Sequence, residues 1–405
     1  MELVADSGFK KMQTTATAST VESASDPAPA PALLGPQHFE FTGTGAEYFR
    51  IWVVNLLLTV VTFGIYSAWA KVRRLQYFYR NTRVAGSIFD YHGKPGAILK
   101  GRLFALVLVA AYKIALDISV VAAIVVALVL AGIMPWLLAR AFRFKFANSS
   151  YRGLRFRFRG TVGAAYRMLI LFPITLAFIG LFVWSLVASF SARPSFGVIF
   201  LIALLPIVAL GGTVPLAHYF LKRYQHDNAD FGQSPFFFHA RPGDFFKIYA
   251  KSIGFFILGS IPATIFGVLT AKAYRFLLDT TFGWLFAMLY GVLSAYAFYF
   301  FVRSYMESRI QNLVWQSTEL VDHRFESSVS ARKLTWIHAS NLLLITLTFG
   351  LYKPFAVVRL IKYRVESMTL VPTGDLAEFL VDQSIESASA IGQEAGDFFD
   401  IDIAL

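Results

Sequence analysis

NTRVAGSIFDYHGKPG, residues Asn81–Gly96, places a glycine five residues after its asparagine and an aromatic residue three residues after that glycine. The same order occurs in NSSYRGLRFRFRGTVG (Asn148–Gly163) and, more loosely, in NADFGQSPFFFHARPG (Asn228–Gly243). Parts of it recur as FEFTGTG (Phe39–Gly45) and RFESSVS (Arg324–Ser330). Alternating aromatic residues before a glycine predict a short strand that ends in a turn, and the asparagine predicts the end of a helix. We therefore interpret the chain as a unit of helix, turn and strand that is used several times.

A basic and aromatic stripe precedes the asparagine. Arg73, Tyr77 and Asn81 are spaced four residues apart, and the spacing recurs at Arg140–Asn148 and at Arg359–Ser367. Residues four apart share one face of a helix, so the stripe is predicted to mark a helix end at the membrane surface. Arginines there contact anionic headgroups, and aromatic rings lie at the interface. The predicted headgroup contacts are Arg73, Tyr77, Arg140, Arg155, Arg157, Arg159 and Arg359.

The two ends of the chain also resemble each other. NLLLTVVTFGIYSAWAKVRRLQY (Asn55–Tyr77) aligns without gaps with NLLLITLTFGLYKPFAVVRLIKY (Asn341–Tyr363). Amides and hydroxyls in lipid need partners, which neighbouring helices usually supply, while broken segments at matching positions mark solute sites in transporters. The shared polar and glycine residues are thus predicted either to pack helices or to line a polar pathway: Asn55, Thr62, Gly64, Asn341, Thr348 and Gly350.

The composition excludes a water-soluble or disordered protein for most of the chain. Of 405 residues, 56% are hydrophobic and 15% are charged, whereas soluble domains carry about a quarter charged residues. The absence of cysteine excludes disulfides, thiolate metal sites and cysteine catalysis. Lys and Arg outnumber Asp and Glu by 37 to 25, which gives a net charge of +12.

Long apolar runs predict an all-α polytopic membrane protein, with six to eight membrane helices in repeated units and short cytoplasmic β-strand and turn motifs. Loops rich in Lys and Arg place these motifs on the cytoplasmic side. The predicted domains are a disordered polar, Ala-Pro-containing tail (1–38), a membrane domain (39–364) and an acidic C-terminal tail (365–405). Within the membrane domain we expect helix pairs at 102–141, 165–221 and 246–303, and equivalent end segments at 50–80 and 336–364.

Two topologies remain open for the end segments. If both span the membrane, eight helices cross it and both tails lie outside. If both enter and return, six helices cross it, both tails lie inside, and Thr62–Gly64 and Thr348–Gly350 form the turns. Each half then has about 15 residues, or about 22 Å of helix, which is short for a span.

Three motifs occur in order along the chain: FEFTGTGAEYFRIWVVNLLLTVVTFGIYSAWAKVRRLQYFYRNT from Phe39, FDYHGKPG from Phe89 and NSSYRGLRFRFRG from Asn148. Together they resemble the YjgN family of bacterial inner-membrane proteins, a family of unknown function. The resemblance covers roughly Phe39 to Arg364. It implies an inner-membrane location and supplies no activity, substrate or catalytic residue.

The motifs of known catalytic sites are absent from the sequence. HExxH, GxSxG and a metal-ligand cluster are all missing, so we expect no enzyme, no cofactor and no metal site. We expect a multi-pass inner-membrane protein that acts as a small-solute transporter or channel-like protein. The alternative is a non-transporting scaffold or envelope factor that binds anionic lipid or protein partners through a basic-aromatic cytoplasmic face. The expected partners are the lipid bilayer and anionic phospholipid at the cytoplasmic face, without nucleic acid, and a homo-oligomer is left open.

Overall fold

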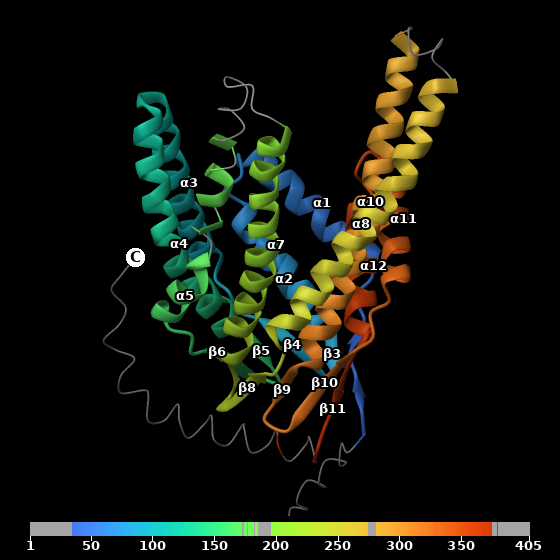
Figure 1. Cartoon of the computed structure of the whole chain (residues 1–405). Coiled ribbons are helices and arrows are strands. Elements are labelled where there is room, and N and C mark those ends of the chain that lie inside the picture. Colours follow the sequence, from blue (N-terminus) through green and yellow to red (C-terminus); the bar gives the residue numbers. More distant parts are fainter. Residues whose placement is uncertain are drawn as a thin grey trace, which may run out of the picture.

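The computed structural model describes residues 35–171, 174–175, 177–181, 183–184, 196–273, 281–374 and 379. Its strands are β1 (Gln37–His38), β2 (Glu40–Phe41), β3 (Thr82–Val84), β4 (Ser87–Tyr91), β5 (Ser149–Tyr151), β6 (Leu154–Phe158), β7 (Ala229–Phe231), β8 (Ser234–Phe238), β9 (Thr318–Leu320), β10 (His323–Ser327) and β11 (Met368–Val371). Its helices are α1 (Gly45–Val61), α2 (Ser67–Arg80), α3 (Pro95–Ile118), α4 (Val120–Ala147), α5 (Val162–Leu169), α7 (Phe196–Asp227), α8 (Pro242–Ala273), α10 (Thr281–Gln316), α11 (Ala331–Leu347) and α12 (Lys353–Glu366). The strands gather at one end of the molecule, and the long helices rise away from them (Figure 1).

The eleven strands form one antiparallel sheet in the order β1-β11-β10-β9-β8-β7-β6-β5-β4-β3-β2. The two strands at the ends of this order, β1 and β2, are separated in the chain by Phe39 alone. The segment 37–41 therefore pairs with β11 on one side and with β3 on the other. The sheet closes almost completely into a barrel, and it needs both ends of the chain to do so.

The predicted all-α polytopic fold class, with isolated strand motifs, is therefore wrong. Strands of two to five residues are not stable as separate hairpins, because a lone hairpin has two open edges and buries little apolar area. Each hairpin here pairs instead with the next one. The local pattern predicted strands and turns but not this pairing, which joins residues as far apart as His38 and Thr369.

The sheet also includes residues that the sequence analysis assigned to the two tails. Gln37–His38 and Met368–Val371 are strands β1 and β11. The rest of the predicted N-terminal tail up to residue 34, and the predicted acidic tail beyond residue 374 apart from Phe379, lie outside the described residues.

A recurring hydrogen bond ties each strand end to the next helix end. The backbone N–H that follows each even-numbered strand donates to the carbonyl oxygen of a residue that ends a helix. The five bonds measure 2.8–2.9 Å and run from Thr42 to Asn81, His92 to Asn148, Arg159 to Asn228, His239 to Ser317 and Ser328 to Ser367. The described chain thus contains five equivalent units of paired helices and a hairpin, the fifth hairpin being shared between the two chain ends.

The residues of the repeated pattern explain the local geometry. The side-chain amides of Asn81, Asn148 and Asn228 each donate to the carbonyl oxygen four residues earlier and so cap their helices. In the turns Ala85-Gly86 and Arg152-Gly153, both residues have positive φ. Type I′ hairpin turns require this conformation, which accounts for the glycine five residues after the asparagine.

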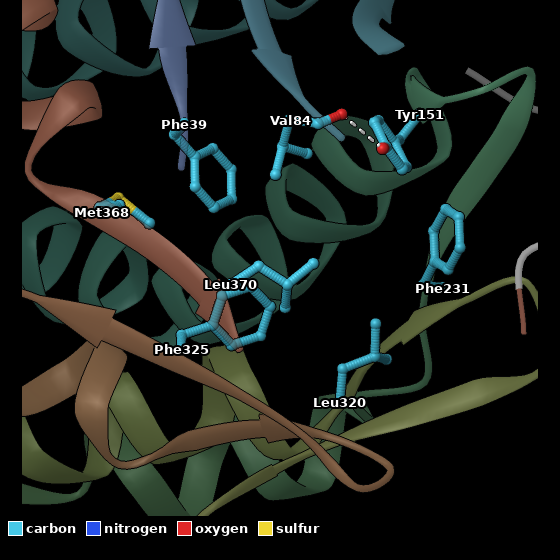
Figure 2. Close-up of a cluster of buried hydrophobic side chains, with 8 residues drawn as sticks. All are labelled: Phe39, Val84, Tyr151, Phe231, Leu320, Phe325, Met368 and Leu370. Atoms are coloured by element: carbon cyan, nitrogen blue, oxygen red, sulfur yellow. Dashed lines mark hydrogen bonds between the residues drawn. The ribbon is translucent and has the colours of Figure 1, made fainter. Parts of the chain in front are cut away.

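Two sets of equivalent side chains fill the barrel. The third residues of the odd-numbered strands from β3 to β11 are all buried, and Figure 2 shows them gathered inside the sheet: Val84, Tyr151, Phe231, Leu320 and Leu370. The middle residues of the even-numbered strands from β4 to β10 are all phenylalanines, and Phe39 lies between β1 and β2. We call this set the phenylalanine ring: Phe39, Phe89, Phe156, Phe236 and Phe325. In the order given, from Phe39 to Phe325, the centroids of consecutive aromatic rings are separated by 6.3–6.5 Å.

Both end segments form helical hairpins that turn at Thr-Phe-Gly. Phe63 and Gly64 between α1 and α2 have φ of 48° and 90°, and Phe349 and Gly350 between α11 and α12 have φ of 49° and 91°. The helices of each hairpin pack against each other, and α1 also packs against α12. The backbone of both end segments therefore turns back on itself at Thr-Phe-Gly, which is where the turn was expected for a segment that enters the membrane and returns.

Among the described residues, one helix, α4, is long and apolar enough to cross a membrane. The described part of the chain therefore does not support the predicted six to eight membrane helices. α7, α8 and α10 are longer than α4, with 32, 32 and 36 residues, but each includes positions whose side chains lie outside the description.

The barrel core predicts a clear difference between two phenylalanines on neighbouring strands. Phe231 on β7 is 2% exposed and Phe237 on β8 is 45% exposed. Phe231→Ala should lower the free energy of unfolding by about 3–5 kcal/mol, because it leaves a cavity that the closed sheet cannot fill. Phe237→Ala, the matched control, should cost less than about 1 kcal/mol. Thermal unfolding in detergent tests this, and equal midpoints for the two variants would contradict a packed barrel.

Candidate functional site

A cavity of about 830 Å³ lies where the helices meet the barrel. Its walls come from α2, α4, α7, α8, α10 and α12, and its barrel side comes from strands β4 to β8. The wall consists mainly of aromatic and aliphatic side chains, together with the charged residues Lys145, Lys222, Arg303, Glu307 and Arg364. A volume of this size is typical of sites for small organic molecules.

The repeated unit brings these residues to the cavity. Counted back from the residue that ends each helix, the position two residues earlier supplies Tyr79, Phe146, His226 and Trp315. The position three residues earlier supplies Lys145, Gln225, Val314 and Arg364. The same hydrogen bond fixes all five helix ends on the barrel, and each unit supplies at least one of these two positions to the cavity wall. Phe78 and Val365, at the remaining two positions, pack in a separate apolar cluster.

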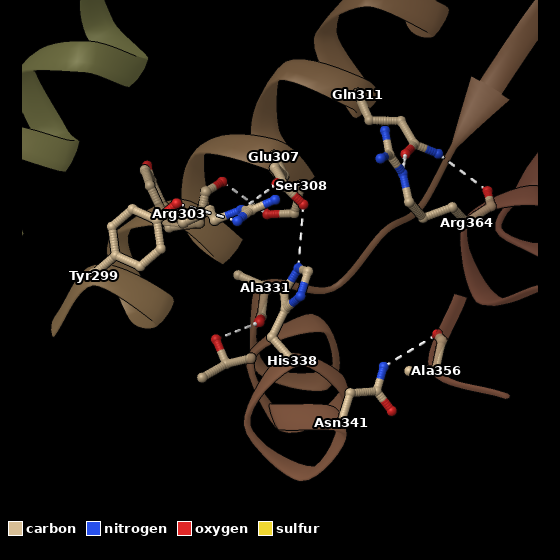
Figure 3. Close-up of polar contacts among 12 residues, drawn as sticks. Tyr299, Arg303, Glu307, Ser308, Gln311, Ala331, His338, Asn341, Ala356 and Arg364 are labelled. Carbon is tan, nitrogen blue, oxygen red and sulfur yellow. Dashed lines mark hydrogen bonds and ion pairs between the residues drawn. The ribbon is translucent and has the colours of Figure 1, made fainter. Parts of the chain in front are cut away.

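Three cations on the cavity wall have no acidic partner. Lys145 is exposed, Lys222 and Arg364 are half-buried, and none of the three has a carboxylate within ion-pair distance among the described residues. Arg364 is held in place by Gln311: its Nε donates to Gln311 Oε1 at 2.6 Å, and Gln311 Nε2 donates back to the Arg364 carbonyl oxygen at 3.0 Å (Figure 3). The arrangement leaves a fixed excess of positive charge.

The carboxylate on the wall, Glu307, is already neutralised. Arg303 Nε lies 2.7 Å from Glu307 Oε1, and His338 Nε2 lies 3.2 Å from Glu307 Oε2 (Figure 3). Glu307 therefore balances Arg303 and not the three free cations.

Burial and the neighbouring cations lower the pKa values of Lys222 and His226. Both residues lie beyond the apolar run of α7, in its last turns beside the barrel. Burial, followed by the charges of Lys145 and Arg364, lowers the pKa of Lys222. Burial, followed by the charges of Lys222 and Lys145, lowers the pKa of His226 to about 3.

His226 is neutral and its tautomer follows from its partner. Thr318 Oγ1 donates its proton to the Val314 carbonyl oxygen at 2.6 Å, so it accepts from His226 Nδ1 at 3.1 Å. The other nitrogen of His226, Nε2, is then an acceptor. His226 contributes a neutral polar atom to the wall rather than a further charge.

The six residues predicted for a polar pathway or helix packing do not line this cavity. Asn341 Nδ2 donates to the Ala356 carbonyl oxygen at 3.2 Å and so joins α11 to α12. Asn55 is buried at the equivalent place in α1. Thr62 and Thr348 each bridge the end of one helix to the start of the next, through the N–H groups of Tyr66 and Tyr352, and Gly64 and Gly350 occupy the turns.

The seven predicted headgroup contacts have varied surroundings. Arg159 pairs with Asp230 at 2.7 Å, Arg359 donates to Ser340 Oγ at 2.7 Å, and Tyr77 donates to the Thr44 carbonyl oxygen at 2.8 Å. Arg73 and Arg140 lie over aromatic rings of their own helices. Arg155 lines a groove on the outer side of the barrel, and Arg157 lies beside Asp230.

Sequence analysis did not identify the three cavity cations as a group. The available signal was the register of the repeat, because Lys145 and Arg364 both lie three residues before a helix end. Lys222 lies six residues before its helix end, on a different turn. Among the described residues, no group of three His, Cys, Asp or Glu could hold a metal ion.

The charge coupling in the cavity predicts the reactivity of Lys222. Lys145→Gln should raise the pH at which Lys222 becomes reactive, because a neighbouring positive charge that disfavours the protonated amine is gone. Reductive methylation across a pH series, read by peptide mass spectrometry, measures this midpoint. Lys247→Gln, at an exposed lysine on α8 that pairs with Asp244, is the control and should cause no shift. An unchanged Lys222 midpoint in Lys145→Gln would contradict the coupling.

Comparison with known proteins agrees with the resemblance seen in the sequence. The chain is 25% identical over 358 residues to "Inner membrane protein YjgN" of Salmonella typhimurium strain LT2, covering 83% of this chain and 88% of that protein. It is 32% identical over 145 residues to the protein of the same name from Escherichia coli K12, covering 35% and 36%. No solved structure matches the chain. The family model described as "Bacterial protein of unknown function (DUF898)" matches residues 36–398, so the chain belongs to the DUF898 family.

Proposed function

We propose that this protein resides in the bacterial inner membrane and binds a small anionic solute in the central cavity, as part of a transporter-like or channel-like role. The names of its relatives support the location. The observation that carries the solute assignment is the set of three unpaired cations, Lys145, Lys222 and Arg364, around one cavity.

The physical argument is the cost of holding three cations around one cavity. Lys222 loses hydration and is repelled by the charges of Lys145 and Arg364, and both effects lower its pKa. An anion that enters the cavity supplies charge-assisted hydrogen bonds, each contributing about 1.5–3 kcal/mol. Binding then costs little rearrangement, because Gln311 already orients Arg364.

Binding and passage of a solute suit the wall better than catalysis does. Its charged groups are three free cations and one carboxylate that is fully engaged with Arg303 and His338. A general base works best with a pKa near the operating pH. His226, whose Nε2 carries a free lone pair, has its pKa lowered to about 3 by burial and by the charges of Lys222 and Lys145. In this proposal the cations recognise the solute and do not transform it.

The end hairpins support a membrane location. Their tips carry Phe63 and Phe349, which are 99% and 98% exposed. The adjoining residues Val61, Leu347 and Leu351 are exposed as well. Apolar side chains this open to solvent suit a lipid environment, and we place both tips in the bilayer.

Binding of inorganic phosphate to the purified full chain in neutral detergent tests the proposal. Lys222→Gln should weaken binding about tenfold or more, because it removes one charge-assisted contact. Lys247→Gln, at the exposed lysine on α8, should leave the affinity unchanged. Isothermal titration calorimetry measures both. Equal affinities of the native protein and Lys222→Gln would contradict the proposal.

Transport is tested separately by uptake of radiolabelled phosphate into proteoliposomes. Uptake that is abolished by Lys222→Gln supports passage of the solute through the cavity. Binding without uptake would remove the transport part and leave a binding protein of the inner membrane.

A groove on the outer side of the barrel favours a second candidate, the scaffold that contacts anionic phospholipid. It has a volume of about 620 Å³ and is lined by Arg83, Arg152 and Arg155 from two neighbouring hairpins. Flotation with liposomes that contain phosphatidylglycerol should weaken in Arg152→Gln/Arg155→Gln without loss of phosphate binding. Unchanged flotation of that variant would remove this candidate.

A further inference from the structure

The cavity has two chemically different surfaces. One carries the cations Lys145, Lys222 and Arg364. The other, on the barrel side, carries three members of the phenylalanine ring, Phe89, Phe156 and Phe236, beside the smaller Ser149 and Ala229. These two surfaces face the same space, so a ligand that fills it meets both.

The phenylalanine surface is rigid. Phe156 lies between its two ring neighbours, with centroids 6.5 Å from Phe89 and 6.4 Å from Phe236. Phe156 also packs on Phe231 of the barrel core, at 5.3 Å. Since interiors packed this way do not rearrange at little cost, the ring offers a fixed apolar face.

Further aromatic side chains adjoin the cations. Phe146 follows Lys145 directly in α4, and Trp315 of α10 packs on Phe325 of the ring at 5.4 Å. Both line the cavity. The apolar surface therefore extends from the barrel up the walls to the charged groups.

A small inorganic anion matches only half of this site. It would satisfy the cations but leave the phenylalanine surface and most of the 830 Å³ filled with water. A neutral apolar molecule would cover the phenylalanines and leave three cations unpaired. A molecule with an acidic group at one end and an apolar body at the other satisfies both surfaces at once.

We propose that the ligand of the cavity is an amphipathic organic anion, such as a phosphate ester or carboxylate that carries an aromatic or acyl group. Its acidic group binds Lys145, Lys222 and Arg364, and its apolar part rests on Phe89, Phe156 and Phe236. The inference rests on the proposed function and names the class of solute. This chemistry is shared by soluble organic anions and by phospholipids.

Three probes separate the need for an acidic group from the need for an apolar group: inorganic phosphate, phenyl phosphate and benzyl alcohol. With the full chain in neutral detergent, calorimetry should show phenyl phosphate binding at least about tenfold more tightly than phosphate or benzyl alcohol. The phenyl group buries apolar area against a preformed apolar face. A tenfold gain in affinity requires only about 1.4 kcal/mol, which is modest for the burial of an aromatic ring. This comparison needs no variant and so does not depend on the folding of one.

Variants then show which residues cause the higher affinity for phenyl phosphate. Phe156→Ala should reduce the advantage of phenyl phosphate over phosphate to less than about threefold while phosphate binding is retained. Phe237→Ala, an exposed phenylalanine on β8 that does not line the cavity, should preserve the advantage. Lys222→Gln should weaken phosphate and phenyl phosphate alike.

The outcomes distinguish the inference from the proposed function. If phosphate and phenyl phosphate bind equally and Lys222→Gln weakens both, the amphipathic ligand is overturned and the anion site stands. Benzyl alcohol binding as tightly as phenyl phosphate would overturn the need for an acidic group. If Lys222→Gln changes neither anion, the proposed function fails, and the inference fails with it.

Nanodiscs identify the source of the ligand. Phenyl phosphate affinity is compared in phosphatidylcholine nanodiscs with and without one quarter phosphatidylglycerol, at about equal ionic strength. A loss of affinity with phosphatidylglycerol that disappears in Lys222→Gln supports a lipid as the amphipathic anion. An unchanged affinity supports a soluble organic anion of the same class.

Discussion

The pairing of residues 37–41 with two strands at once is the constraint on which the rest of the structure depends. On one side His38 lies opposite Thr369, and on the other Glu40 lies opposite Arg83. Without this segment the sheet would keep two open edges, which expose unpaired backbone groups. With it, the five hairpins form a nearly closed barrel, and the helix end that each hairpin holds points to a common centre.

The cavity follows from that closure. Each helix end is fixed to the barrel by the same backbone hydrogen bond, and every unit places at least one of the residues two and three positions before that end on the cavity wall. The identity of the side chains then decides the chemistry: α4, α7 and α12 supply Lys145, Lys222 and Arg364, and other positions supply aromatic rings. Function in this account arises from differences between equivalent units on a regular frame.

Much of the local structure could be predicted from the sequence. Gly86 and Gly153 marked hairpin turns because positive φ favours glycine, and Asn81 and Asn148 marked helix ends that their side chains cap. The two Thr-Phe-Gly segments were correctly singled out as places where the chain could turn. These features depend on residues close together in the chain.

The closed barrel and the cavity could not be predicted in the same way. Pairing of β1 with β11 joins the two ends of the chain, and no local pattern encodes such a contact. Lys145, Lys222 and Arg364 belong to three different helices. Each one alone reads as an ordinary basic residue near a membrane surface, so the fold class was wrong and the attention given to Asn55 and Asn341 missed the cavity.

The most direct test of the account is whether the chain ends close the sheet. The protein has no cysteine, so the pairs His38→Cys/Thr369→Cys and Glu40→Cys/Arg83→Cys can each be introduced alone and oxidised in native membranes. Opposite residues on antiparallel strands place their Cβ atoms about 4.5–5.5 Å apart, so the account predicts an intramolecular disulfide in both variants, seen as a mobility shift that reductant reverses. Failure of both pairs to cross-link, with each variant folded and inserted, would contradict a closed barrel and the central cavity built on it.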